Sequence, residues 1–438
     1  MDVVKYSVRR TLQELPEIAL RKVLRRKMRE AGYELPAKAA KAFAEHVMKG
    51  AQARFSWKQG RSAEVRHIDL TFTDADAVEL ETTVSTMTKA LPGAIAKASD
   101  KVSLLYFKSL CEKWATEGVS QAEEIESFRH NLEERWGDGL GLMRMLLTCC
   151  RELGRETFLR HRRSRAAGHA HRRWVMVRLH SRACQVANEI ICLMENGFAD
   201  GAMARWRTLH ELAVTAAVIS AGDEALAERY VLHDAVDVKR QADDHDATQV
   251  PLGFSPVNKR QRNRIDRQYQ SVIDRFGPMF AHPYGWAADA LKLKKPTFKD
   301  LQKSAGRESM NSYHKLASFN VHAGARSLFF KLSSMGDEEV LLAGRSNAGL
   351  VEPGVRTAQT LALITSLYLG HETDLDRLTE LKSVLRIKDA VAPALVAADA
   401  LLHEDELMHR AKLMARRARR STGKQSVRRN KGGSAEQA

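Results

Sequence analysis

The stretch ARWRTLHEL, residues 204–212, decides how this sequence folds. It opens a helix whose continuation, residues 213–219, is apolar on nearly every side, which is typical of a helix in a protein interior. Arg207 and Glu211 are four positions apart, so a helix places both on one side, together with His210. The pattern predicts a buried helix with a polar site at its entrance.

A second stretch, YHKLASFNVHAG at residues 313–324, predicts another helix with one polar stripe. His314, Ser318 and His322 fall at positions i, i+4 and i+8, opposite an apolar side that includes Leu316. We expect the two helices to meet and to bring their polar sides together.

Most of the remaining sequence also has the periodicity of amphipathic helices separated by short breaks. The predicted fold class is therefore all-α, with a multi-helix bundle over residues 126–407. Residues 1–125 are predicted to form an N-terminal basic region of mixed α and β structure. Residues 408–438 are predicted to be a disordered basic tail, because ten basic and no acidic residues lie between positions 410 and 431.

The best strand candidates lie in the N-terminal region. Residues 54–57 and 65–72 carry aromatic and β-branched side chains, and residues 58–60 suit a turn. The pattern predicts one small hairpin within residues 1–125.

The charge of the chain indicates a polyanionic partner. The 438 residues carry a formal net charge of +16, and ten arginines fall between residues 151 and 182. Such clusters favour nucleic acid before a membrane, although solvated helix faces explain the same pattern. The partner expected is nucleic acid, RNA before DNA. The sequence contains no signal peptide and no apolar run long enough to span a membrane. Five cysteines with no CxxC pair are typical of reduced thiols, so a cytoplasmic location is expected.

The sequence lacks the motifs of several classes of enzyme. There is no GxxxxGK[ST] loop, no GxGxxG after a strand and no GxSxG elbow. The histidines between residues 161 and 180 have neither HExxH spacing nor nearby Cys ligands. We therefore expect no nucleotide cofactor and no metal.

Two interpretations of the polar residues remain open. Arg207 and Glu211 form an internal ion pair that fixes helix packing, because an unpaired buried charge costs several kcal/mol, about 3–5. Alternatively, His322 acts as a general acid or base, Arg207 holds a phosphate and Glu211 orients one of them. Ser318 and Tyr313 are then hydrogen-bond partners. A cation with proton donors and acceptors is suited to cleaving RNA through its 2′-hydroxyl.

These residues also carry a resemblance. An Arg-x-x-x-Glu helix followed by a Tyr-x-x-x-x-Ser-x-x-x-His helix resembles a bacterial helical family described only as a domain of unknown function. The resemblance covers roughly residues 170 to 335. The matching residues are Arg207, Glu211, Trp286, Tyr313, Ser318 and His322. It implies a helical fold and little chemistry.

A weaker resemblance concerns the HEPN ribonucleases, small all-α enzymes of bacterial defence. Their Arg-x(4–6)-His motif is matched by Arg205 and His210, although Trp206 stands where that family usually has a polar residue. The resemblance implies metal-independent RNA cleavage, a defence setting and a site at a homodimer interface. Helical nucleic-acid-binding or sensing proteins and protein–protein adaptors are the alternative classes, since they need only the basic or the apolar faces.

Overall fold

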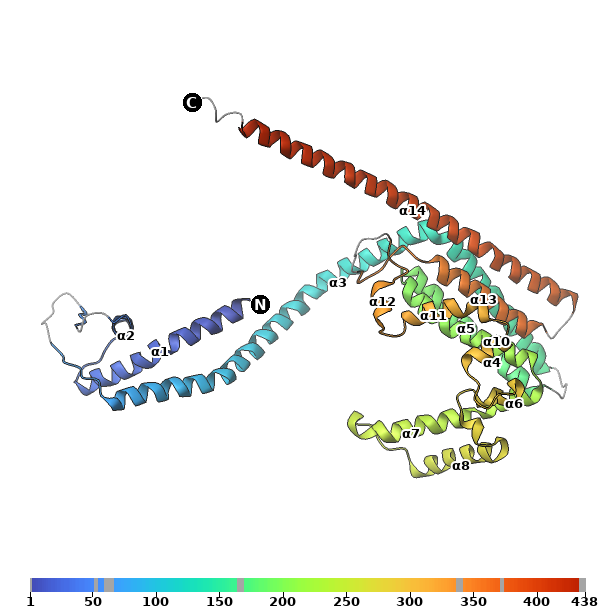
Figure 1. Ribbon diagram of the computed structural model, residues 1–438, viewed down its shortest axis with the longest axis horizontal. Coiled ribbons are helices and arrows are strands. Elements are labelled where there is room, and N and C mark those ends of the chain that lie inside the picture. Colours follow the sequence, from blue (N-terminus) through green and yellow to red (C-terminus); the bar gives the residue numbers. More distant parts are fainter. Residues whose placement is uncertain are drawn as a thin grey trace. The chain divides into compact units, whose positions relative to one another are not determined.

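The protein is almost entirely helical (Figure 1). The structure is a computed structural model that describes residues 2–50, 54–58, 67–163, 169–335, 342–370 and 374–432. Among these residues there are helices, turns and irregular segments but no strand, which confirms the predicted all-α class. The chain divides into two compact units, Met1–Ala122 and Glu123–Ala438.

The first unit contains α1 (Asp2–Glu30), α2 (Ala37–Met48) and the beginning of α3 (Asp74–Arg163). The carboxylate of Asp76 joins α1 to the start of α3, because Lys27 Nζ lies 2.6 Å from it. The Thr73 backbone N–H also donates to that carboxylate over 2.7 Å. An ion pair between α1 and α3 and an apolar contact between α1 and α2 thus hold this unit together.

The predicted hairpin is wrong for the residues that the structure describes. Residues 54–58 and 67–73 are irregular, and residues 59–66, with most of the predicted turn, lie outside the described residues. Phe55 instead stacks on Phe43 of α2, with ring centroids 4.7 Å apart. The aromatic ring of Phe55 is thus packed against helix α2, and not against a neighbouring strand.

The second unit is a bundle of helices that begins with the later part of α3. Its elements are α4 (Ala170–Glu195), α5 (Ala199–Ala221), α6 (Glu224–Leu232), α7 (Asp234–Leu252), α8 (Lys259–Phe276), η1 (Pro278–Ala281), η2 (Gly285–Ala287), α9 (Ala288–Leu291), α10 (Phe298–Ser304), η3 (Glu308–Met310), α11 (Asn311–Phe319), α12 (Ala325–Phe329), α13 (Val351–Leu369) and α14 (Leu375–Gly432). Helices α4, α5, α13 and α14 pack side by side, whereas α7 and α8 form a separate helical hairpin (Figure 1).

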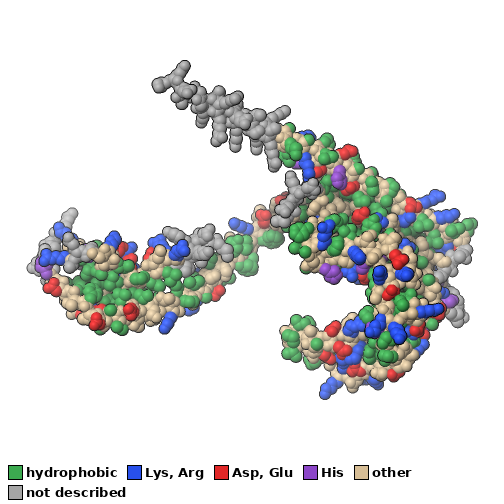
Figure 2. Space-filling model, viewed as in Figure 1, with side chains coloured by type: hydrophobic (Ala, Val, Ile, Leu, Met, Phe, Trp, Pro, Cys, Tyr) green, Lys and Arg blue, Asp and Glu red, His purple; other side chains and the backbone are tan. Residues whose placement is uncertain are grey.

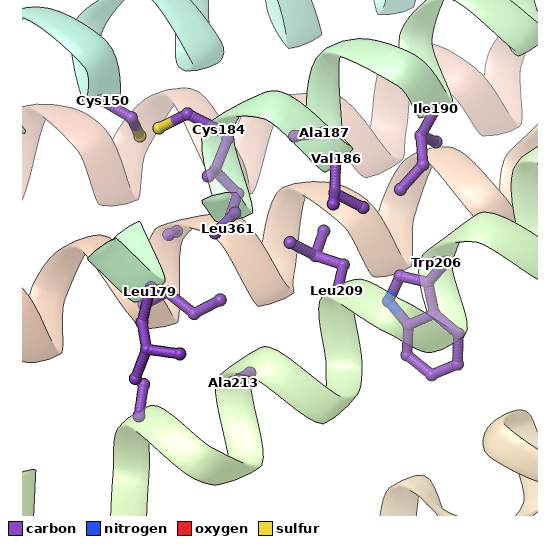
Figure 3. Close-up of a cluster of buried hydrophobic side chains, with 14 of the residues drawn as sticks. Cys150, Leu179, Cys184, Val186, Ala187, Ile190, Trp206, Leu209, Ala213 and Leu361 are labelled. Atoms are coloured by element: carbon purple, nitrogen blue, oxygen red, sulfur yellow. The ribbon is translucent and has the colours of Figure 1, made fainter. Parts of the chain in front are cut away.

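The core of the bundle is built around α5, as its apolar sequence predicts. Trp206, Leu209 and Ala213 of α5 are buried against Ile190 of α4 and Leu361 of α13 (Figure 3). The indole Nε1 of Trp206 donates to Thr360 over 3.0 Å, so this large side chain is buried with its polar atom satisfied. One side of α5 remains accessible to solvent. We call this side, which includes Arg205, Arg207, Thr208, Glu211 and Leu212, the outward strip of α5.

Turn chemistry explains how α4 gives way to α5. The helix α4 ends at Asn196-Gly197, where Gly197 has φ +73° and the Phe198 N–H donates to Leu193 O over 2.9 Å. Asp200 lies in the first turn of α5. Its carboxylate accepts from the backbone N–H of Leu332 over 2.9 Å and ties the segment after α12 to α5.

The basic tail that the sequence predicts to be disordered, residues 408–438, lies at the end of α14. The structure continues this helix to Gly432, and residues 433–438 lie outside the described residues. Arginine, lysine, alanine and glutamine are good helix formers, and here they extend a helix that is already nucleated.

Basic and acidic side chains of the α7–α8 hairpin form ion pairs with one another. Figure 2 shows Lys and Arg side chains interspersed with Asp and Glu over this part of the molecule. Lys239 of α7 lies 2.6 Å from Asp243, and Arg262 of the basic helix α8 lies 3.1 Å from Asp246. Arg262 of α8 is therefore neutralised by acidic residues of α7. No helix in the described part of the chain is long and apolar enough to cross a membrane.

Candidate functional site

A cluster of polar side chains forms where α11 packs on α5. Arg207 and Glu211 lie on the outward strip of α5, and α11 covers them from the side with His314. His322 lies just beyond the end of α11, where its backbone N–H donates to Ser318 O over 3.1 Å. The two polar stretches of the sequence are thus brought together.

Arg207 is the centre of this cluster. Its Nε lies 3.1 Å from Glu211 Oε1 and 3.2 Å from His314 Nε2, and its Nη1 lies 3.3 Å from His322 Nε2. The His314 ring nitrogen also lies 3.3 Å from Glu211 Oε1. One guanidinium, one carboxylate and two imidazoles therefore share a single hydrogen-bonded group, which we call the Arg207 cluster.

The cluster is partly accessible to solvent. The side chain of His314 is 13% exposed, that of Arg207 27% and that of Glu211 42%, while His322 is exposed. This gradient leaves His322 and one edge of the guanidinium open to a ligand, with His314 behind them.

The electrostatics of the cluster favour an ionised Glu211. The hydrogen bond from His314, followed by the charge of Arg207, lowers the pKa of Glu211 against the opposing effect of burial. Nearby, burial and then the negative charge of Glu211 raise the pKa of Tyr284. His314 Nε2 either accepts from Arg207 or donates to Glu211, and the tautomer decides which. The carboxylate is thus a built-in acceptor for an imidazole proton.

Ser318 and Tyr313 support α11 and do not contribute donors to the cluster. Ser318 Oγ donates to the backbone oxygen of His314 over 2.7 Å. The Tyr313 ring lies under the guanidinium of Arg356 from α13, 3.8 Å from its carbon. Arg356 is in turn 3.1 Å from Glu352. Both predicted site residues therefore fix the helix that carries His314.

The two residues of the Arg-x(4–6)-His pattern do not meet. His210 is buried with a pKa lowered to about 4 by desolvation, stacks on Trp206 and lies 3.0 Å from Gln302 Nε2. Arg205 faces α4, where it pairs with Glu189. His210 was predicted to share the side of Arg207 and Glu211, but it turns into the core, because three residues along a helix leave a 60° offset from Arg207.

His314 is the residue that the sequence prediction left out of the site. The sequence placed it on the polar stripe with Ser318 and His322, yet gave the titrating role to His322 alone. The i, i+4 spacing of His314 and Ser318 could have identified His314 as a site residue. The contact of His314 with Glu211 could not be predicted from the sequence, because it joins helices about a hundred residues apart in the chain.

Other reactive side chains of the bundle are less suited to chemistry. Cys150 and Cys184 meet in the core between α3 and α4 (Figure 3), and burial raises the pKa of each thiol to about 12. A thiol with so high a pKa is a poor nucleophile near neutral pH. Within the described ranges, no group of three or more His, Cys, Asp or Glu side chains is arranged to hold a metal ion.

Residues 173–339 match the model of a family described as a family of unknown function (DUF5677). This match confirms that a domain of unknown function covers roughly the predicted part of the chain and includes the whole Arg207 cluster. Comparison with curated proteins and with solved structures gave no match. The family match says nothing of the Arg-x-x-x-Glu pattern or of HEPN ribonucleases.

Proposed function

We propose that the Arg207 cluster cleaves RNA without a metal ion, by attack of a 2′-hydroxyl on the adjacent phosphate. This reaction needs a cation on the phosphate, a proton acceptor and a proton donor. The observation that carries the proposal is that the Arg207 guanidinium lies within 3.2 and 3.3 Å of two imidazoles, His314 and His322. Imidazole is the side chain whose ordinary pKa lies closest to neutrality.

We assign different roles to the two histidines. His322 is exposed and its Nε2 lies 3.3 Å from Arg207 Nη1, beside the cation that would hold the phosphate, so we assign it as the proton acceptor from the 2′-hydroxyl. His314 Nε2 lies 3.3 Å from Glu211 Oε1, where a ring N–H can be held, so we assign His314 as the proton donor. The 2′-oxygen forms a bond to phosphorus, the bond to the 5′-oxygen breaks, and His314 protonates that oxygen. The products are a 2′,3′-cyclic phosphate and a 5′-hydroxyl.

The test is cleavage of labelled RNA by the full chain in EDTA, with the product ends identified. We expect His322→Ala and His314→Ala each to lower the rate about 10²–10⁴-fold, the typical contribution of a general acid or base. His130→Ala is the matched control, because His130 is an exposed histidine on α3 that pairs with Glu134. Cleavage that needs a divalent ion, or that survives in both cluster variants, contradicts the proposal.

A non-catalytic nucleic-acid-binding protein is the second candidate. It is favoured by the ion pair of Arg207 with Glu211, which already satisfies the guanidinium in the manner of a packing contact. This alternative predicts that RNA is bound and stays intact, and that Arg207→Ala lowers thermal stability more than RNA affinity. A role in phage defence and a homodimer belong to the RNA-cleavage proposal, since both derive from the HEPN resemblance, and a cytoplasmic location is proposed from the cysteine pattern.

A further inference from the structure

We propose that the outward face of α4 around Trp174 and Arg178 binds single-stranded nucleic acid by stacking an unpaired base on the Trp174 indole. Delivery of that strand to the Arg207 cluster rests on the proposed function. The binding face itself does not, and it is argued from contacts outside the cluster.

Trp174 is a large aromatic side chain at the surface. It is 46% exposed, although the neighbouring Val175 and Met176 are buried in the core. Arg178, one helical turn further, lies with its guanidinium carbon 3.5 Å from the centre of the Trp174 ring. Arg178 Nη1 donates to the Trp174 backbone oxygen over 3.2 Å. A half-exposed indole whose orientation is fixed by a stacked arginine is a preformed stacking surface for a planar base.

The charge on this face suits a phosphodiester backbone. In the described part of the chain Arg178 has no carboxylate partner, so its charge is not neutralised by an ion pair. One turn further, Arg182 lies 3.8 Å from Glu189, and the same carboxylate also pairs with Arg205 of α5. Arg182 and Arg205 thus share one carboxylate and Arg178 has none among the described residues, which leaves the face positively charged.

The outward strip of α5 connects this face to the Arg207 cluster. On one side of the strip Arg205 contacts α4, and on the other Arg207 contacts α11. Between them Thr208 and Leu212 are half-buried and accessible. A strand stacked on α4 therefore has an accessible surface to follow towards His322.

The basic helix α8 is the natural competitor for such a partner. Its residue Arg262 is engaged by three aspartates, Asp243, Asp246 and Asp266. A neutralised arginine releases few counterions on binding a polyanion, so Arg262 adds little affinity. The face of α4 combines free positive charge with an exposed aromatic ring, and it is the better site for a single strand.

The test measures the affinity of the full chain for a labelled oligodeoxythymidine of about 12 nucleotides, a length typical of such sites. This oligonucleotide lacks the 2′-hydroxyl, so it reports binding when cleavage is excluded. Trp174→Ala is expected to weaken binding about tenfold or more, and Trp174→Phe to restore most of it. Arg178→Gln is expected to weaken it severalfold. Trp57→Ala, in the other unit at the same 46% exposure, is expected to bind like the wild type.

A duplex of the same length separates stacking from charge. Its bases are paired, so Trp174→Ala is expected to leave its affinity unchanged. Wild-type affinity in Trp174→Ala, an equal loss on the duplex, or no binding of single strands by the wild type overturns the proposal.

The experiments test the proposed binding face and the proposed cleavage site independently. Trp174-dependent binding without RNA cleavage upholds the face and removes the proposed reaction. Cleavage with an unchanged KM in Trp174→Ala upholds the reaction and removes the face.

Discussion

Burial separates two kinds of histidine in this protein. His314 and His322 lie around an arginine near the surface, whereas His210 and His180 are 2% and 3% exposed inside the bundle. Burial lowers the pKa of each of the latter two to about 4, because the core disfavours the charged ring. The buried histidines are therefore structural side chains that stay neutral in the folded protein.

This burial predicts a pH dependence of stability. The folded-state pKa values of His210 and His180 lie below the ordinary value of 6.5, so the unfolded chain binds more protons between about pH 6.5 and 4. Stability should be fully present above that window and fall by about 3 kcal/mol per histidine as the pH drops through it.

The measurement is the free energy of unfolding of wild type and His210→Phe at several pH values. The variant should be less stable at pH 7, because Gln302 loses its partner, and its slope near pH 5 should be smaller by about 1.4 kcal/mol per pH unit. Parallel curves for the two proteins contradict a neutral, buried His210.

At the scale of elements, close packing explains why glycines occur inside helices. An added Cβ at Gly139 of α3 would lie 2.4 Å from Leu395 of α14, and one at Gly354 of α13 also 2.4 Å from the same side chain. Three helices thus meet around Leu395. Gly141, two residues after Gly139, has open space around its Cα.

The two glycines of α3 should respond oppositely to alanine. Gly139→Ala is expected to destabilise the protein by about 1–3 kcal/mol, because overpacking against Leu395 exceeds the gain in helix propensity. Gly141→Ala is expected to stabilise it by up to about 1 kcal/mol. Thermal unfolding of both variants checks this, and Leu395→Ala should remove the clash in a double variant. Equal effects at the two positions contradict the packing argument.

At the scale of the molecule, each unit has its own apolar contacts. The large core is formed within residues 123–438, and the small clusters around Leu24 and Ala39 belong to the first unit. The Arg207 cluster and the α4 face both lie in the second unit.

A fragment of residues 123–438 is therefore expected to fold alone. It should show a cooperative thermal transition and a helical circular dichroism spectrum, and it should bind oligodeoxythymidine within about threefold of the full chain, a difference of less than 1 kcal/mol. A non-cooperative transition means that the first unit completes the core. Weak binding by a folded fragment means that the basic residues of α1 take part.

The sequence by itself determined the helices and one contact of the site. Apolar periodicity marked α5 as the interior helix, and the i, i+4 spacing paired Arg207 with Glu211. Both follow from the fixed 100° step of a helix, which is a local property. The same step did not predict that residues 54–58 and 67–73 are irregular, because strand candidates become strands only when a partner is present.

Only the tertiary structure decided which polar residues share the site. It placed His314 and His322 around Arg207, turned His210 towards Gln302 and covered Tyr313 with Arg356. The rotation of α11 against α5 depends on apolar surfaces that are distant in the chain, among them Ala317 of α11 and Leu301 of α10. Spacing within one helix carries no information about that rotation, and the packing of the core supplies it.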